Sequence, residues 1–232
     1  MSRRLIAFVA LALLAAPVFI WAGFWQLRRL EERRARNRTL ASRLAEPEVA
    51  FEQLRDSTSF RRATIAGIPD YENEIIFTGR SRNGSPGVYI LTPVRRAGND
   101  TAVIVIRGWV YAPDAASADL ARWREHRTAF RGFVATLAVK SASQPSGRKL
   151  RALTVQGVRK LLPYPAAAQY MVLEDSISSD SVPARIPVPA LDDGPHLSYA
   201  IQWFSFATIA IVGAGAVVLR ARRQGSGGST GA

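Results

Sequence analysis

Two long apolar stretches bracket the chain, at residues 5–27 and 199–219, and neither contains a charged residue. A helix of about 20 apolar residues is long enough to cross the hydrocarbon core of a bilayer, which is about 30 Å thick. The pattern therefore predicts two transmembrane helices, with the remainder of the chain held between them. A cleaved signal peptide is the alternative for the first stretch, but its apolar region would be about 7–15 residues long, and this one runs past Trp21 and Trp25.

Small residues recur at a spacing of four in both stretches, as Ala12 and Ala16 in the first and Ala210 and Ala214 in the second. Small side chains on one helix face let two membrane helices approach closely. The two predicted helices are therefore candidates to pack on each other through these faces. Alanine-rich helices that face lipid would show the same spacing.

The part of the chain between the apolar stretches is long enough for one domain of ordinary size, and its pattern is that of short β-strands. Strands are predicted at residues 63–65, 74–78, 88–94, 102–110 and 133–139, with weaker ones at 153–158 and 170–174 and a helix at 114–125. Asn83-Gly84 and Gly98-Asn99-Asp100 are typical of hairpin turns. The run Val103-Ile104-Val105-Ile106 is apolar on both faces, which predicts a central strand with both faces covered.

Charges near the two apolar stretches indicate the side of the membrane. Residues 220–223 carry three arginines after the second stretch, while Asp192 and Asp193 precede it, and positive residues are enriched on the cytoplasmic side. This pattern places the C-terminus in the cytoplasm and, with two spans, the N-terminus as well. Six arginines within residues 28–38 oppose this assignment, but loops longer than about 60 residues cross membranes largely regardless of their charge. We therefore predict that the domain lies outside the cytoplasm.

The predicted fold is a membrane protein in which two transmembrane helices flank an extracytoplasmic α+β domain dominated by an antiparallel β-meander or barrel. The predicted segments are a transmembrane helix at 5–27, a helical extension at 28–46, a β-rich domain at 47–177, a proline-rich linker at 178–195, a second transmembrane helix at 196–219 and a basic, disordered cytoplasmic tail at 220–232.

The composition is strongly basic, with 31 Lys and Arg against 18 Asp and Glu. Such an excess can indicate nucleic-acid binding, but the densest run of arginines directly follows an apolar stretch, where lipid headgroups are the nearer anions. We therefore predict no nucleic-acid partner. The chain has no cysteine, which excludes disulfides, thiolate metal sites and cysteine nucleophiles.

Residues suited to catalysis are few. The chain has two histidines, His126 and His196, and it contains neither a Gly-x-Ser-x-Gly elbow nor a glycine-rich phosphate loop after a strand. His126 lies among arginines and is interpreted as a surface residue. Because no nucleophile and base pair is visible, we predict that the protein is not an enzyme, and we reject an extracytoplasmic hydrolase.

One helix face at the start of the second apolar stretch combines a histidine with aromatic residues. Tyr199, Trp203 and Phe206 follow His196 at spacings of three, seven and ten, so all four share this face. Tyrosine and tryptophan are typical of the interfacial belt of membrane proteins, which is one interpretation. A neutral imidazole above an apolar aromatic face is also suited to ligate haem iron, with arginines after the first stretch available for the propionates. The residues alone leave both interpretations open.

Four motifs along the chain resemble those of a known family. They are Gly23-Phe24-Trp25-Gln26-Leu27-Arg28-Arg29, Gly87-Val88-Tyr89-Ile90-Leu91-Thr92-Pro93, Ile106-Arg107-Gly108-Trp109-Val110 and His196-Leu197-Ser198-Tyr199-Ala200-Ile201-Gln202-Trp203-Phe204. Their order and the two-span layout resemble the surfeit-locus (Surf/Shy) family of cytochrome c oxidase assembly factors. The resemblance covers residues 20–110 and 196–206 and is poor between them, and Pro195 stands where the family commonly has asparagine.

The resemblance implies a non-enzymatic factor for the assembly of cytochrome c oxidase, in a bacterial-type inner membrane, with cytoplasmic termini and a periplasmic domain. The partners that it implies are the catalytic subunit of the oxidase, the machinery of haem a synthesis and the lipid bilayer. It further implies that His196 binds haem a. With the aromatic face, this predicts a site in which His196 ligates the iron, Tyr199 and Trp203 border the porphyrin, and Arg28 or Arg29 lies near its propionates. The alternative is a membrane-tethered β domain that acts as a structural or protein-interaction module without a cofactor.

Overall fold

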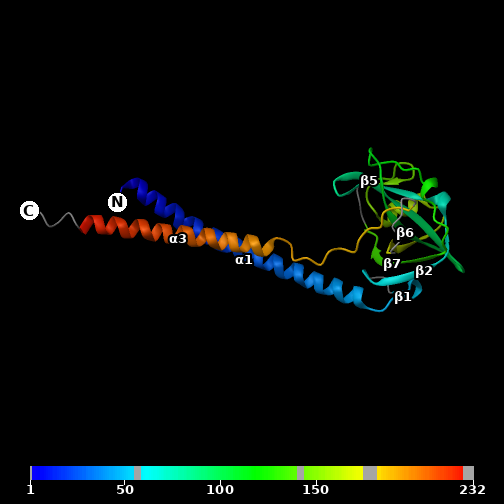
Figure 1. Cartoon of the computed structure of the whole chain (residues 1–232), viewed down its shortest axis with the longest axis horizontal. Coiled ribbons are helices and arrows are strands. Elements are labelled where there is room, and N and C mark those ends of the chain that lie inside the picture. The colour runs from blue at the N-terminus through cyan, green and yellow to red at the C-terminus, as the bar shows by residue number, and fades with distance from the viewer. Residues whose placement is uncertain (1, 55–58, 140–143, 175–181, 227–232) are drawn as a thin grey trace, which may run out of the picture. The chain divides into compact units, whose positions relative to one another are not determined.

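The structure, a computed structural model, describes residues 2–54, 59–139, 144–174 and 182–226 (Figure 1). The chain divides into two compact units. One consists of Met1–Thr39 with Leu191–Ala232, and the other is Leu40–Ala190. The first unit is helical, and the second is built around a β-sheet.

The helical unit consists of two long helices, α1 (Arg3–Ala45) and α3 (His196–Ser226), except that residues 40–45 of α1 belong to the second unit. By length and composition, both are apolar enough to cross a membrane. α1 runs through Pro17 and ends two residues before Pro47, because proline disfavours helix at the residue before it. α3 continues to Ser226, so residues 220–226 are helical where the sequence predicts a disordered tail, and residues 227–232 lie outside the described residues.

Small residues lie where α1 and α3 run side by side (Figure 1). Ala200, Ala207 and Ala214 on α3 are almost fully buried, and their spacing of seven brings the same helix face back every two turns. Ala16 on α1 is also buried. Of the small residues that the sequence singled out, Ala16 and Ala214 are buried as the predicted packing requires, whereas Ala12 and Ala210 are only partly buried.

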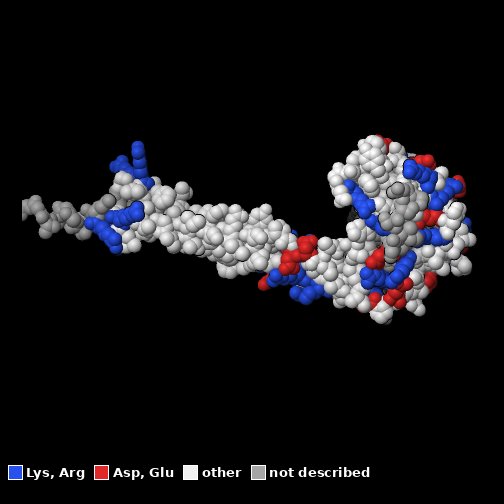
Figure 2. Space-filling model, in the orientation of Figure 1, with Lys and Arg blue, Asp and Glu red and all other residues white. Residues whose placement is uncertain are grey.

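Charged side chains gather at the two ends of this helical unit. On the face shown in Figure 2, one end carries basic residues, the other carries basic and acidic residues together, and the length between them is uncharged. This band corresponds to the two stretches without charge, residues 5–27 and 199–219. An uncharged band of this kind is what insertion into a hydrocarbon layer requires.

The second unit contains, within the described residues, a mixed sheet of nine strands in the order β1-β2-β7-β9-β6-β5-β4-β8, with β3 paired to β5. The strands are β1 (Val49–Ala50), β2 (Arg62–Ala66), β3 (Ile68–Pro69), β4 (Ile75–Arg82), β5 (Ser85–Arg96), β6 (Asn99–Tyr111), β7 (Ala129–Thr136), β8 (Lys149–Leu150) and β9 (Ala166–Leu173). A short helix, α2 (Val155–Leu161), precedes β9. Three 3₁₀ turns, Phe51–Gln53, Tyr71–Asn73 and Ala121–Trp123, complete the described elements.

The predicted antiparallel meander is correct for β4, β5 and β6 and wrong for the sheet as a whole. Asn83 and Gly84 join β4 to β5 with φ angles of +50° and +80°, the backbone that a tight hairpin turn requires. β6 and β9, however, are parallel, as are β1 with β2 and β4 with β8. Hairpins are encoded by local turn residues, whereas parallel pairs join segments that are distant in the sequence.

β6 is the central strand that its apolar run predicts. It lies between β5 and β9, and Val105 pairs with Thr92 on one side and with Met171 on the other. Val105 has no exposed surface. The predicted central position of residues 103–106 is therefore confirmed.

The predicted helix at residues 114–125 is wrong. Only Ala121–Trp123 is helical, as a single 3₁₀ turn. The Asp114 carboxylate accepts the amides of Ala116 and Ser117, as an N-cap would, but Ala115 has a φ of +50°, which is incompatible with helix. The local hydrogen bonds of Asp114 therefore close a turn rather than begin a helix.

The weak strand predicted at residues 153–158 is also wrong, because this segment begins α2. The hydroxyl of Thr154 accepts the amide of Gly157 at 3.1 Å and caps the helix N-terminus. Thr154, a β-branched residue of this segment, thus serves as the N-cap of a helix and not as part of a strand.

The predicted linker at 178–195 is partly attached to the sheet. Its described part begins at residue 182. Ala184 donates to and accepts from the backbone of Trp109 on β6, with nitrogen to oxygen distances of 2.8 and 2.7 Å. A Cβ at Gly108 would lie 2.5 Å from the carbonyl oxygen of Ala184, so only glycine permits this approach. Ala184 therefore attaches this segment to β6 through backbone hydrogen bonds.

Candidate functional site

His196 is the first residue of α3, and the turn before it sets its position. The amide of Gly194 donates to Oδ1 of Asp192 at 2.9 Å, and Gly194 has a φ of +67°, a conformation that favours glycine. The carbonyl oxygen of Pro195 accepts the amide of Tyr199 at 3.1 Å and so begins the helix. The proline that departs from the family pattern thus starts α3 at the histidine.

The side chain of His196 contacts Gln26 of α1, with 2.9 Å between Nδ1 and Oε1, and both residues are half-buried. The oxygen of a carboxamide only accepts hydrogen bonds, so a neutral imidazole in this pair would carry its proton on Nδ1 and leave Nε2 unprotonated. Nε2 bonds to no residue that the structure describes. A neutral histidine in this tautomer can bind a metal ion through Nε2.

The two helices approach each other closely beside this pair. Gly23, one turn before Gln26, lies against Phe204, and a Cβ at position 23 would be 2.6 Å from the Cε1 atom of that ring. Ala200, one turn after His196, is 1 % exposed. The helix faces that carry Gln26 and His196 are therefore the faces through which α1 and α3 pack.

The aromatic residues that follow His196 do not all have the same surroundings. Trp203 stacks on Phe19 of α1 with 5.8 Å between ring centroids, and Phe206 lies 5.8 Å from the same ring. These side chains contribute to the contact between the helices. Tyr199, in contrast, is 47 % exposed. The predicted stripe is therefore split between helix packing and an open surface.

The two arginines predicted beside the histidine lie on different faces of α1. Arg29 is one turn from Gln26 and pairs with Glu32, with 2.6 Å between Nη1 and Oε2. Arg28 is exposed, and at two helix positions from Gln26 it is turned about 200° from that residue. The structure thus places Arg29, and not Arg28, on the side of α1 that meets His196.

Two further arginines of α1 hold the turn before α3. The carboxylate of Asp192 lies 3.4 Å from Nη2 of Arg33, and that of Asp193 lies 2.8 Å from Nη2 of Arg34. Asn37 donates to the carbonyl oxygen of Asp192 at 2.8 Å. Two arginines of the basic run at residues 28–38 therefore form ion pairs with Asp192 and Asp193, the acidic residues that precede the second apolar stretch.

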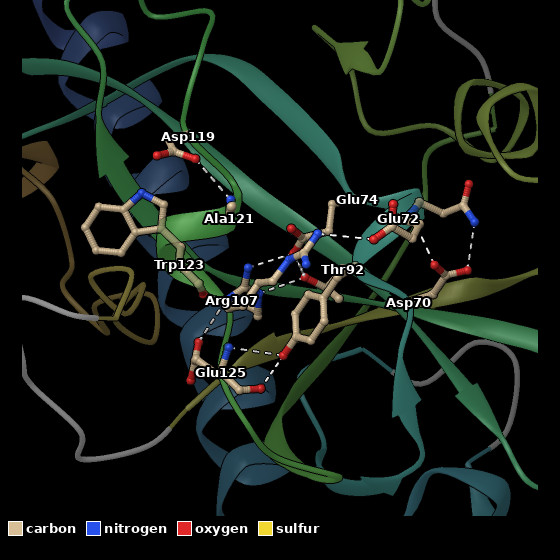
Figure 3. Close-up of polar contacts among 12 residues, drawn as sticks. Asp70, Glu72, Glu74, Thr92, Arg107, Asp119, Ala121, Trp123 and Glu125 are labelled. Atoms are coloured by element: carbon tan, nitrogen blue, oxygen red, sulfur yellow. Dashed lines mark hydrogen bonds and ion pairs between the residues drawn. The ribbon is translucent and has the colours of Figure 1, made fainter.

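A second group of polar side chains is buried inside the β domain around Arg107 (Figure 3). Arg107 follows the apolar run of β6, and its guanidinium donates to Glu74 at 2.6 Å, to Thr92 at 2.7 Å and to Glu125 at 3.2 Å. It also donates to the carbonyl oxygen of Trp123. Arg107 and Glu74 have no exposed side-chain surface. Thr92 and Arg107 come from two of the four motifs that carry the family resemblance, so this cluster joins them.

Glu125 is shared by three arginines of this cluster. Arg107, Arg127 and Arg185 lie 3.2, 3.2 and 2.7 Å from its carboxylate oxygens. Glu74 has only Arg107 as an ion-pair partner among the described residues, and its Oε2 is buried without a hydrogen bond. Burial raises the pKa of Glu74 although the charge of Arg107 opposes the shift. The cluster links Glu74, which directly precedes β4, to Thr92 of β5, Arg107 of β6 and Arg185 of the 182–190 segment.

Sequence reasoning missed Gln26, Glu74, Glu125 and Arg185. Arg107 was a usable signal, because a cation that follows an apolar strand covered on both faces must have a carboxylate partner. Which glutamate supplies that partner depends on the fold. Among the described residues no group of three or more His, Asp or Glu side chains is arranged to hold a metal ion.

Comparison with known proteins places these features in a family context. The model of the SURF1 family matches residues 13–208. A SURF1-like protein of Rickettsia conorii is 24 % identical over 210 residues, which cover 87 % of each chain. A SURF1-like protein of Rickettsia prowazekii is 23 % identical over 199 residues, covering 82 % of this chain and 81 % of the relative. With a SURF1-like protein of Rickettsia felis the identity is 29 % over 99 residues, and this match spans less than half of either chain, 42 % and 43 %.

Proposed function

This chain belongs to the SURF1 family, and from that premise we propose that it is a membrane-anchored assembly factor for cytochrome c oxidase that holds or delivers haem a during maturation of the catalytic subunit. The observation that carries the proposal is the hydrogen bond between His196 and Gln26, where two apolar helices meet. It leaves one histidine nitrogen free at the end of an apolar surface, which suits an amphiphilic porphyrin. The catalytic subunit and the machinery of haem a synthesis are the partners in this proposal.

The residues around His196 fit a haem as cargo. Gly194 has no side chain, and a Cβ there would lie 3.6 Å from Cδ2 and 3.8 Å from Nε2 of the ring, so glycine adds no side chain beside this edge. In the proposed site, Nε2 of His196 would hold the iron, and Tyr199 and Trp203 would border the porphyrin. When bound, haem a would supply an iron centre that a neutral imidazole can ligate.

Of the two arginines proposed for the propionates of the cargo, Arg28 and Arg29, only Arg29 lies on the side of α1 that meets His196. Arg28 makes no ion pair with any residue that the structure describes. Arg29 would exchange its pair with Glu32 for a propionate. The side chains of Arg29 and Glu32 are 45 % and 56 % exposed, and an exposed pair of this kind is worth less than about 1 kcal/mol, so this exchange has a low cost.

We further propose that the protein is anchored in a bacterial inner membrane with both termini in the cytoplasm and the β domain in the periplasm. The basic residues in the last turns of α3 support this orientation.

The second candidate is a membrane-tethered β domain that acts as a structural or protein-interaction module without a cofactor. One specific observation favours it, because Trp203 and Phe206 contact Phe19 of α1 and so have a packing role without a porphyrin. In that case the aromatic stripe serves the contact between the helices.

Haem binding and oxidase assembly separate these candidates. The full-length protein is produced with and without haem a synthesis in a strain that lacks its own copy, and bound haem and assembled oxidase are measured by absorbance spectroscopy. We expect His196→Ala to lose bound haem while the β domain remains folded, and His126→Ala, at an exposed position, to keep it. If the His196 variant copurifies with as much haem as the parent, the ligand role is wrong. If no variant affects oxidase assembly, the assembly proposal is wrong.

A further inference from the structure

We propose that Gln26 is a positioning residue that selects the tautomer of His196 and so presents Nε2 as the free nitrogen for a metal. The identity of that metal as haem iron rests on the proposed function, whereas the choice of tautomer does not. The proposal starts from the 2.9 Å contact between Oε1 of Gln26 and Nδ1 of His196, which joins residues 170 positions apart in the chain.

The hydrogen bond can select a tautomer because of the chemistry of its two groups. Neutral imidazole carries one proton, on either Nδ1 or Nε2, and a carboxamide oxygen interacts favourably only with the protonated nitrogen. Histidines that bind metals through one nitrogen usually donate the other N–H to an acceptor, which fixes the ring and increases the basicity of the ligating atom. Gln26 occupies the position of such an acceptor.

The surrounding packing makes this contact well defined. Gly23 and Gln26 lie one helix turn apart on α1, and His196, Ala200 and Phe204 lie at successive turns on α3. The ring of Phe204 lies so close to Gly23 that a Cβ there would be 2.6 Å away, and Ala200 is buried. The close contact of the two helices therefore fixes the distance between Gln26 and His196, which lie beside it.

Gly194 adds no side chain beside the ring edge that carries Nε2. A side chain at this position would begin 3.8 Å from Nε2, and the φ of +67° disfavours any residue with a Cβ. The two nitrogens therefore differ: Nδ1 contacts Gln26, and Nε2 bonds to no residue that the structure describes.

A simpler role for the pair is adhesion, since polar side chains can join apolar helices by a hydrogen bond. Adhesion requires only that the two side chains attract each other, and either tautomer would serve if the amide group turned over. The two roles therefore differ in the protonation of the ring, which can be measured without any haem.

The first experiment measures the tautomer. Full-length protein with ¹⁵N-labelled histidine is prepared without haem in detergent micelles, with His126→Gln as background so that one histidine remains. We expect nitrogen chemical shifts of a single neutral tautomer, protonated at Nδ1, in the parent. Gln26→Met removes the acceptor at similar length and should give a mixture of both tautomers. The matched control is Gln202→Met, an exposed position on α3, which should leave the single tautomer unchanged.

The second experiment adds haem a synthesis and compares the same variants. Loss of an outer-sphere partner typically weakens metal binding about 10- to 100-fold, which is the loss expected for Gln26→Met. Gln26→Glu keeps an acceptor and adds charge, which makes Nε2 a stronger donor and should lower the reduction potential of the bound iron, while Gln26→Met should raise it. A purely adhesive role would not shift the potential in opposite directions.

The outcomes separate the two proposals. A mixture of tautomers in the parent, or a single Nδ1–H tautomer that persists in Gln26→Met, would overturn the role of Gln26 whether or not haem binds. Absence of haem from the parent would overturn the proposed function instead, and the nitrogen shifts would still decide the role of Gln26.

Discussion

Arg185 and Glu125 form a two-point ion pair inside the β domain: Nη2 of Arg185 donates to Oε2 of Glu125 at 2.7 Å, and Nη1 donates to Oε1 at 3.2 Å. The same guanidinium donates to the carbonyl oxygen of Arg107 at 2.7 Å. Beside it, Ala184 forms backbone hydrogen bonds with Trp109 of β6. The segment at 182–190 is therefore held on the sheet by the ion pair of Arg185 and by the backbone hydrogen bonds of Ala184.

Replacing Glu125 by glutamine should destabilise the β domain strongly. The change removes the charge that Arg107, Arg127 and Arg185 share, and breaking a buried ion pair from one side typically costs about 3–5 kcal/mol. Urea unfolding of the detergent-solubilised protein, followed by tryptophan fluorescence, measures the loss. The matched control is Glu72→Gln, because the Glu72 side chain is 85 % exposed and its pair with Arg124 should contribute less than about 1 kcal/mol. Equal losses in the two variants would contradict the role assigned to the cluster.

Replacing Val105 by aspartate should prevent folding of the β domain. Val105 has no exposed surface and lies on the central strand β6, so the new carboxylate would be buried without a partner. The cost of several kcal/mol is comparable with the total stability of a domain, about 5–15 kcal/mol. Protein yield and resistance to protease measure the effect. Ile68→Asp, at a side chain that is 71 % exposed, is the control and should be tolerated. Wild-type protease resistance in the Val105 variant would show that the strand does not need this position to be apolar.

The stability of the protein in acid should depend on Asp114. The hydroxyl of Ser117, with the amides of Ala116 and Ser117, lowers the pKa of Asp114 from 3.8 to about 2. Because the pKa is lower in the folded state, the carboxylate stabilises the fold well above pH 3.8, and this contribution is lost as the pH falls towards about 2. Melting temperatures of the parent and of Asp114→Asn should therefore converge over this range.

Ser117→Ala sharpens this test. It removes the largest cause of the shift, so the pKa of Asp114 should move back towards its usual value. The acid-dependent loss of stability should then be smaller than in the parent and be complete at a higher pH, because the folded-state pKa lies closer to the unfolded one. A difference in melting temperature between parent and Asp114→Asn that stays constant down to pH 2 would show that the carboxylate does not titrate as described.

The orientation in the membrane can be tested with reporter fusions. Alkaline phosphatase is active only outside the cytoplasm, so a fusion after Gly147 in the β domain should be active and a fusion after Arg223 should be inactive. The physical reason is the basic end of α3, which positive-inside sorting keeps in the cytoplasm. The reverse pattern of activity would place the β domain in the cytoplasm and would exclude the proposed periplasmic site.

Features encoded by neighbouring residues were predictable from the sequence. The two apolar helices follow from runs without charge, the hairpin between β4 and β5 follows from Asn83-Gly84, and the covered strand follows from residues 103–106. His196 was singled out by its place at the start of an apolar helix. In each case the physical signal lies within about 20 consecutive residues, where periodicity and turn chemistry act.

The tertiary structure decided the features that join distant segments. The sequence could not show that Gln26 is the partner of His196, that Glu125 is the partner of Arg185, or that β9 lies parallel to β6. It also suggested a helix at 114–125, where the positive φ of Ala115 closes a turn. Local pattern determines which segments are helix or strand and which face is apolar. The choice among several possible partners for a buried charge or a ring nitrogen depends on packing across the whole fold, and only the folded chain makes that choice.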